Sequence, residues 1–128
     1  MLRLSKLNAE ERWAKYATRV LEMAALPMSR HPSAFGNLLC ALDFTLSRPR
    51  EIAVAGDPAS PETQLLLQEI FRRYLPNTVV ACGGGGRPAL IEGRAPVGAK
   101  PAAYVCQNYT CRAPVTTAAE LGALLDAP

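Results

Sequence analysis

The chain has 128 residues, of which 49% are hydrophobic and 20% charged, so it is long and apolar enough to form a globular domain. Its formal charge of +3 is too low for intrinsic disorder, and it forms no dense basic stripe, so we expect no nucleic-acid partner. No apolar run reaches the roughly 18 residues that cross a bilayer. The first residues lack the apolar core and cleavage site of a signal peptide. We therefore expect a cytoplasmic protein with no membrane partner.

The first element is predicted to be an amphipathic helix over residues 8–26. Asn8 and Glu11 have the spacing of a capping pair, and Pro27 is predicted to end the helix. Its apolar residues recur at helical spacing on one stripe: Trp13, Ala17, Val20, Leu21 and Ala24.

A second helix is predicted after a short connection that contains His31, the only histidine, which we interpret as an ordinary loop residue. Ser33 is the expected N-cap, Pro49 follows the end, and Cys40 is interpreted as a small buried hydrophobe. The apolar positions are Phe35, Leu38, Leu39, Leu42 and Leu46. Together the two helices form an αα-hairpin over residues 1–48, which buries little by itself.

Residues 49–128 are predicted to form a small α/β module. Residues 50–56 and 78–82 read as strands, and Ser60 followed by Pro61 marks the start of the helix between them. A strand, a helix and a strand in this order form a βαβ unit, so these two strands should be parallel. The helix is expected to bury Leu67, Ile70, Phe71 and Tyr74.

The end of the module is predicted to contain a third strand over 102–106 and a last helix. Thr117 and Glu120 form a capping box at the start of that helix, which is expected to bury Leu121, Leu124 and Leu125. The sequence thus predicts an α/β fold in which an N-terminal αα-hairpin precedes a sheet of about three strands and a C-terminal helix.

Four glycines, 83–86, follow the second predicted strand and raise the question of a phosphate-binding loop. Such a loop requires a helix N-terminus directly behind it, whereas Arg87 and Pro88 intervene here. We interpret the glycines as a flexible connection.

Cys106 and Cys111 are the only closely spaced cysteines. Thioredoxin-type chemistry uses Cys-x-x-Cys at a helix start, whereas this spacing is longer and Pro114 follows. Reduced structural thiols are the favoured interpretation, because a cytoplasmic protein is mostly reduced. A disulfide or redox-sensitive pair across the loop is the main alternative, with a metal site less favoured.

We assign no catalytic residue, no metal ligand and no cofactor from the sequence. Carbohydrate hydrolysis would require two carboxylates that face one sugar, and nothing in the sequence pairs the acidic residues. Each of the four candidates can be explained as part of a helix face, a turn or a cap: Asp43, Glu51, Asp57 and Glu62.

Several blocks of sequence resemble the C-terminal end of one family, the YyaL-type thioredoxin-domain-containing proteins, which are relatives of the mammalian spermatogenesis-associated protein. The resemblance extends from about residue 10 to residue 125 in the same order. The blocks that carry it are PSAFGNLLCALDF (32–44), REIAVAGDP (50–58), FRRYLPN (71–77) and KPAAYVCQNYTCRAPVT (100–116), the last of which includes Asn108.

The resemblance implies that full-length members are several times longer. They have a thioredoxin-like domain with a Cys-x-x-Cys type motif, followed by an α/α toroid similar to N-acylglucosamine 2-epimerases and six-hairpin glycosidases. Residues 1–48 would then be the last hairpin of the toroid, and residues 49–128 the tail of the family. The chain would be a fragment or a stand-alone remnant, and its hairpin should expose the apolar face that the toroid covers.

Three functions follow from these observations. The first is a non-catalytic C-terminal module with a structural role, whose partner is the rest of such a polypeptide or, through the exposed hairpin, a second copy. The second is a thiol-redox-responsive module that uses Cys106 and Cys111. The third is part of a carbohydrate-processing enzyme whose active site lies mostly in sequence outside this chain.

Overall fold

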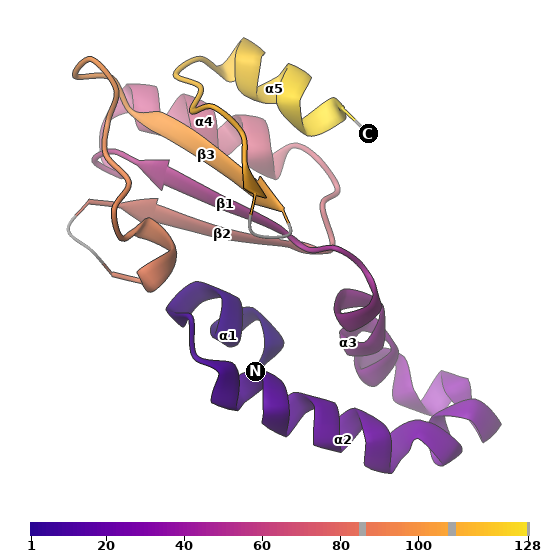
Figure 1. The fold of residues 1–128 in the computed structure, drawn as a ribbon. Helices are drawn as coiled ribbons and strands as arrows, with labels where there is room; N and C mark the ends of the chain where they lie inside the picture. Colours follow the sequence, from indigo (N-terminus) through magenta and orange to yellow (C-terminus); the bar gives the residue numbers. More distant parts are fainter. Residues whose placement is uncertain (85–86, 108–109, 128) are drawn as a thin grey trace.

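The computed structural model describes every residue except 85–86, 108–109 and 128. It is a mixed α/β structure in which a sheet lies between two groups of helices (Figure 1), which confirms the predicted fold class. In chain order the elements are α1 (Leu2–Asn8), α2 (Glu11–Arg30), η1 (Pro32–Phe35), α3 (Gly36–Leu46), β1 (Arg50–Ala55), α4 (Pro61–Phe71), β2 (Thr78–Gly83), η2 (Ala89–Ile91), β3 (Ala102–Gln107), β4 (Thr110–Cys111) and α5 (Ala118–Asp126).

The strands lie in the order β2-β1-β3-β4. β1 and β2 are parallel, with Arg50 opposite Thr78, so the predicted βαβ unit is correct. β3 pairs with the other edge of β1 in the antiparallel direction. The short β4 pairs with β3, also in the antiparallel direction. β1 therefore lies at the centre of the sheet, and its residues 52–55 are buried completely or almost completely.

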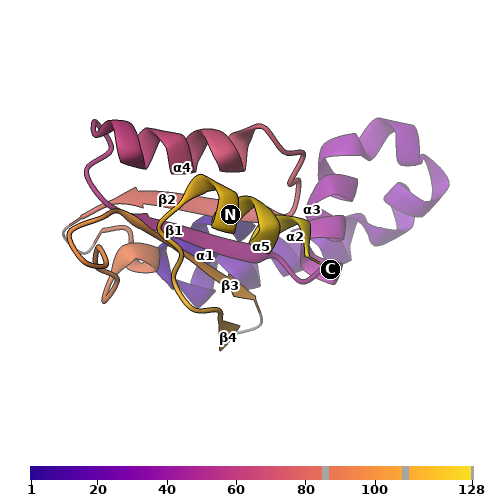
Figure 2. The ribbon, with the colours of Figure 1, turned by 90° about the horizontal axis from the view of Figure 1, so that it is seen from above.

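Alternate residues of β1 face two separate hydrophobic cores, as the pleat of a strand requires. Ile52 and Val54 belong to the core under α4 and α5, and Ala53 to the core on the opposite face. Figure 2 shows α4 and α5 together on one side of the sheet, with α1 on the other. The second core receives Phe44 of α3, residues of η2 and, from α1, the partly buried Leu2 and Leu7.

The two helices of the α/β part start where the sequence predicts. The Ser60 hydroxyl accepts a hydrogen bond from the Thr63 amide, and Thr117 and Glu120 form the expected capping box. The predicted buried face of α4 is only partly correct. Leu66 and Ile70 are buried, whereas Phe71 is 68% exposed in the last position of the helix and Tyr74, after the helix has ended, is 90% exposed. Tyr74 therefore lies beyond the helical periodicity.

The predicted ends of the first helix are wrong. Residues 2–8 form a separate helix, α1, and Ala9 in the left-handed conformation (φ 55°) separates it from α2, whose N-cap is Glu10 and not Asn8. Pro27 lies inside α2, which continues to Arg30. A proline removes one helical hydrogen bond, and here the carbonyl left without that bond belongs to Met23, a residue that is 83% exposed and open to water.

The expected N-cap of the second helix is also wrong, because Ser33 lies inside η1 and Phe35 precedes α3. The boundary expected at 48–49 falls between α3 and β1, but α1 contacts β2 and η2 and thereby joins the helical part to the sheet. The division into 1–48 and 49–128 stays a prediction. No helix among the described residues is both long enough and apolar enough to span a membrane.

Candidate functional site

The structure brings Cys106 and Cys111 together as a disulfide, with their Cα atoms 3.9 Å apart. The favoured interpretation of two reduced thiols is therefore replaced by its alternative. The pairing follows from the sheet, because Cys106 on β3 and Cys111 on β4 are opposite each other in antiparallel register. Asn108 and Tyr109, between the two cysteines, lie outside the described residues.

The two ends of the disulfide differ in solvent access. Cys106 is only 4% exposed, at the end of the buried run of β3. Cys111 lies on β4, where both residues are exposed. A soluble thiol can therefore reach the Cys111 side of the bond more easily than the Cys106 side.

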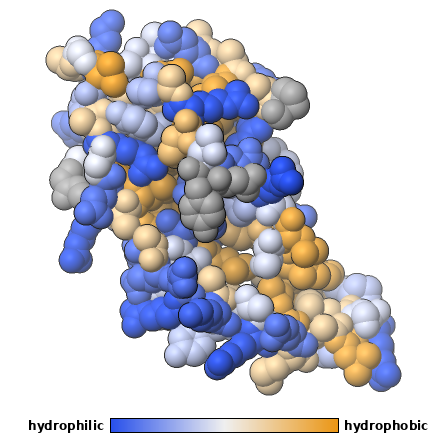
Figure 3. Space-filling model, in the orientation of Figure 1, coloured by the Kyte–Doolittle hydropathy of each residue, from blue (hydrophilic) through white to orange (hydrophobic). Residues whose placement is uncertain are grey.

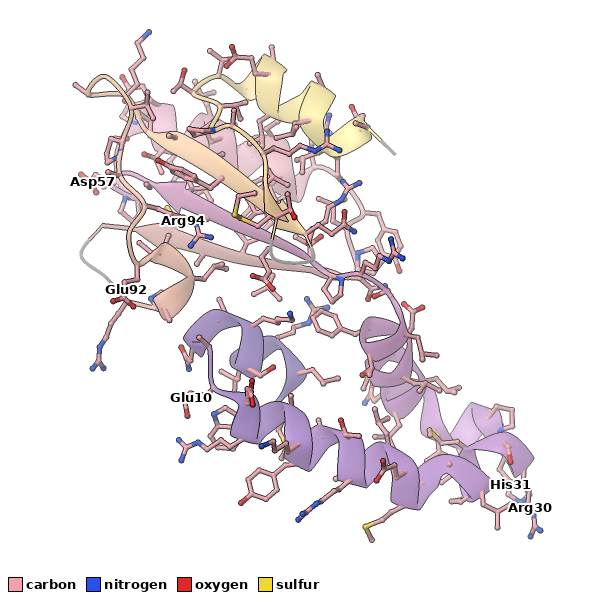
Figure 4. All side chains as sticks on the ribbon, in the orientation of Figure 1. Glu10, Arg30, His31, Asp57, Glu92 and Arg94 are labelled. Atoms are coloured by element: carbon pink, nitrogen blue, oxygen red, sulfur yellow. A yellow bond between two sulfur atoms is a disulfide. The ribbon has the colours of Figure 1, made fainter. Side chains whose placement is uncertain are left out.

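A third residue, Arg94, contacts both sulfur atoms. Its Nη2 lies 3.3 Å from the Sγ of Cys106 and 3.8 Å from the Sγ of Cys111. Figure 4 shows Arg94 reaching from the segment after η2 toward the sheet, next to the yellow disulfide bond. Sequence reasoning did not select this residue, because it lies far from both cysteines along the chain and matches no motif.

The guanidinium of Arg94 is held in place by its surroundings. Its Nη1 donates a hydrogen bond to the carbonyl of Leu90, and its Cζ lies 5.9 Å from the centre of the Tyr104 ring. Tyr104 in turn donates a 2.8 Å hydrogen bond to the carbonyl of Ala95. These contacts bring a permanent positive charge to the disulfide.

The other two cysteines are free. Cys40 is exposed, so its interpretation as a buried hydrophobe is wrong. Cys82 is partly buried, and this burial, together with the negative charge of Asp57, raises the pKa of its thiol. The thiolate of Cys82 is therefore disfavoured, and Cys82 is a poor nucleophile.

The four acidic residues considered for sugar chemistry do not gather at one site, although two of them line the same cavity. Asp43 accepts a 2.7 Å hydrogen bond from Asn77, and Glu51 forms a 3.0 Å ion pair with Lys6. Asp57 and Glu62 line one cavity of about 580 Å³ at the carboxyl end of β1. Asp57 accepts a hydrogen bond from the Ala59 amide in a turn, and Glu62 lies in the first turn of α4. Local structure accounts for both residues.

Within the described part of the chain, no group of three or more His, Cys, Asp or Glu side chains is close enough together to hold a metal ion. His31 is exposed at the end of α2. In the glycine segment considered for phosphate binding, residues 85–86 lie outside the described residues.

A second feature is an apolar groove of about 410 Å³ between α1, α2 and α3, whose lining includes Leu4, Val20, Leu38 and Ala41. Val20 lines the groove and is exposed, and other large apolar side chains are exposed elsewhere on α2 and α3: Tyr16, Met23, Leu26, Leu39 and Leu46. Figure 3 shows hydrophobic residues gathered over the region of α3. Trp13, Leu38 and Leu42 are only partly buried and Val20 is 45% exposed, so the sheet does not cover this helical face.

Comparison with known proteins gives three relatives that match 98% of this chain. The chain is similar to spermatogenesis-associated protein 20. The identity is 27% to the protein of Rattus norvegicus and 26% to those of Homo sapiens and Mus musculus. The chain spans only 17% of the length of each spermatogenesis-associated protein 20. No protein-family model matches the chain, and no solved structure matches it. The relationship seen in the sequence blocks is thus supported along the whole chain.

Proposed function

We propose that this chain is a non-catalytic structural module whose N-terminal helices dock against further helices of a longer polypeptide. The observation that carries the proposal is the open apolar face of α2 and α3. The sheet is covered on both faces by buried side chains, whereas α2 buries only Leu21 and Met28 and α3 only Phe44. An exposed apolar surface of this kind marks a missing interface.

The relatives supply the expected occupant of this face. More than four-fifths of each relative lies outside the matched region, because the chain spans 17% of its length. By resemblance to the YyaL-type family, that remainder would include a thioredoxin-like domain and an epimerase-like α/α toroid. Residues 1–48 would be the last hairpin of the toroid in a cytoplasmic protein. The apolar groove fits such helices, because it lies between three helices and is lined mostly by apolar residues.

The test begins with the genomic sequence upstream of Met1. We expect an in-frame continuation that encodes helices. We also expect the stability of the longer polypeptide to depend on contacts in the groove. Val20→Asp in that polypeptide should lower the thermal midpoint, because Val20 lines the groove. Phe71→Asp is the matched control, since Phe71 is 68% exposed at the far end of α4.

Two results would overturn the proposal. One is an upstream sequence that contains no in-frame helices, which would remove the occupant. The other is an equal effect of Val20→Asp and Phe71→Asp in the longer polypeptide. In the isolated chain, Val20→Asp should cost little stability, because the side chain is already 45% exposed. A stable dimer of the isolated chain that Val20→Asp dissociates would assign the groove to a second copy.

A second candidate function is thiol-redox response through Cys106 and Cys111. The observation in its favour is the disulfide beside the Arg94 guanidinium. Disulfides in reducing compartments are usually transient, catalytic or redox-sensing. Carbohydrate processing has no comparable support, and it stays a prediction about sequence outside this chain.

A further inference from the structure

We propose that Arg94 makes the Cys106–Cys111 disulfide competent for exchange with dithiols, with Cys111 as the sulfur under attack and Cys106 as the leaving thiolate. This inference rests on the second candidate function and names the direction of its chemistry. Three observations carry it: one cysteine is exposed, the other is buried, and a fixed cation contacts both sulfur atoms.

The direction of attack follows from access. An incoming thiolate must approach one of the two sulfurs, and only Cys111 lies on an exposed strand. Cys106 is only 4% exposed. Attack at Cys111 therefore meets fewer side chains, and it expels the sulfur of Cys106.

The choice of leaving group follows from charge. Exchange is faster when the departing sulfur is stable as a thiolate. Arg94 Nη2 lies 3.3 Å from Cys106 Sγ but 3.8 Å from Cys111 Sγ, so the guanidinium is closer to the sulfur that departs. The Leu90 carbonyl and the Tyr104 ring hold the cation there before the reaction begins. Arg94 is thus a positioning residue that stabilises the developing negative charge.

The complete reaction needs a dithiol as reductant. Its first thiolate bonds to the Sγ of Cys111, the bond between the two cysteines breaks, and the electron pair goes to the Sγ of Cys106. The second thiolate of the dithiol then attacks the first sulfur of the same dithiol, which is bonded to Cys111 in the mixed disulfide. This attack releases the Cys111 thiolate. The dithiol is oxidised to a disulfide and the protein gains two electrons, while the two thiol protons pass to solvent or to the released cysteines.

The test measures reduction of the oxidised chain by dithiothreitol at neutral pH, with alkylation of released thiols and peptide mapping. Mapping separates the pair from the free Cys40 and Cys82. A cation within about 4–6 Å favours the thiolate by roughly 1–3 pKa units. For attacking thiols, the logarithm of the exchange rate changes by about 0.4–0.5 per pKa unit. If the leaving thiol has a similar coefficient, Arg94→Gln should slow reduction about 3- to 30-fold. Arg94→Lys should recover most of the rate.

Arg112→Gln is the matched control, because Arg112 follows Cys111 directly and its loss removes the same charge from the same region. The inference is overturned if Arg94→Gln reduces at the wild-type rate, or if Arg112→Gln slows reduction as much. A second measurement uses the wild-type protein alone and therefore does not depend on folding of a variant. Glutathione, a monothiol, should be trapped on Cys111, and trapping on Cys106 would refute the proposed direction.

The outcomes separate this inference from the function on which it rests. If Cys106 and Cys111 of the wild-type chain remain unpaired under oxidising conditions, the candidate function of thiol-redox response is refuted. A disulfide that forms and is reduced normally, with no effect of Arg94→Gln, would end only the role of Arg94. Neither result affects the proposed docking of α2 and α3, which is tested at Val20.

Discussion

Gly122 is the position where one added methyl group should disturb the contact between α4 and α5 most. A Cβ atom there would lie 2.3 Å from Oε1 of Glu69 and 3.0 Å from Nη2 of Arg73. The Glu69 side chain is only 7% exposed, and its Oε1 accepts hydrogen bonds of 2.7 Å from both Arg72 and Arg73. Arg73 also pairs with Asp126 of α5. The carboxylate of Glu69 therefore cannot move aside without losing charged hydrogen bonds.

Two effects of opposite sign decide the result of Gly122→Ala. Replacing glycine inside a helix by alanine stabilises the helix by about 0.8–1.0 kcal/mol. A hydrogen bond to a charged group contributes about 1.5–3 kcal/mol. If the methyl group displaces the Glu69 carboxylate from Arg73 alone, the variant should lose about 0.5–2 kcal/mol of the free energy of unfolding.

Urea unfolding of Gly122→Ala, Glu69→Ala and the double variant provides the assay. In the Glu69→Ala background the obstructing oxygen is absent, so Gly122→Ala should become stabilising by up to about 1 kcal/mol. The sign of the Gly122→Ala effect should thus differ between the two backgrounds. If Gly122→Ala stabilised the protein equally in both backgrounds, the Glu69 side chain would be able to move aside at no cost. That result would refute the reasoning.

Three further results are expected. Arg3 donates hydrogen bonds of 2.5 Å to the carbonyls of Thr78 and Pro76, so Arg3→Met should cost about 1–3 kcal/mol and speed amide exchange in α1. Thr117→Ala should cost about 1 kcal/mol in urea unfolding, and Thr117→Ser should not, because serine also caps a helix. Hydrogen bonds from Arg73 hold the pKa of Asp126 below its ordinary 3.8, so their stabilising contribution is complete above that value and is lost as the pH falls through the lower folded value. Urea midpoints measured on acidification should fall less steeply for Asp126→Asn, and identical profiles would contradict this.

The α/β part was predictable from sequence because its signals are local. Ser60 with Pro61, and Thr117 with Glu120, satisfy the first amides of their helices through residues within one turn. The parallel pairing of β1 and β2 follows from the βαβ order in the same way. Neither prediction requires knowledge of distant contacts.

The ends of the N-terminal helices were not predictable, because tertiary contacts determine them. α1 separates from α2 at Ala9, and α1 packs Leu2 and Leu7 against the core that Phe44 joins. Pro27 is tolerated inside α2, and the next residue, Met28, is buried and anchors the last turn. Local rules for Asn8 and Pro27 favoured other boundaries, and packing overrode them.

The candidate site was predictable only in part. The spacing of Cys106 and Cys111 allowed a disulfide, but whether the two cysteines face each other depends on the register of β3 and β4. Arg94 reaches the sulfurs through the fold of the segment after η2, with no signal near the cysteines. The openness of the helical face was expected from the family resemblance and not from periodicity, because periodicity alone does not show which apolar stripe remains uncovered.

Hydrogen–deuterium exchange measures the proposed docking most directly. The amides of α2 and α3 are compared between the isolated chain and the longer polypeptide expected from an in-frame upstream sequence. We predict that protection rises in α2 and α3 and stays unchanged in β1, which is already buried on both faces. Equal protection of α2 and α3 in the two proteins would contradict the account.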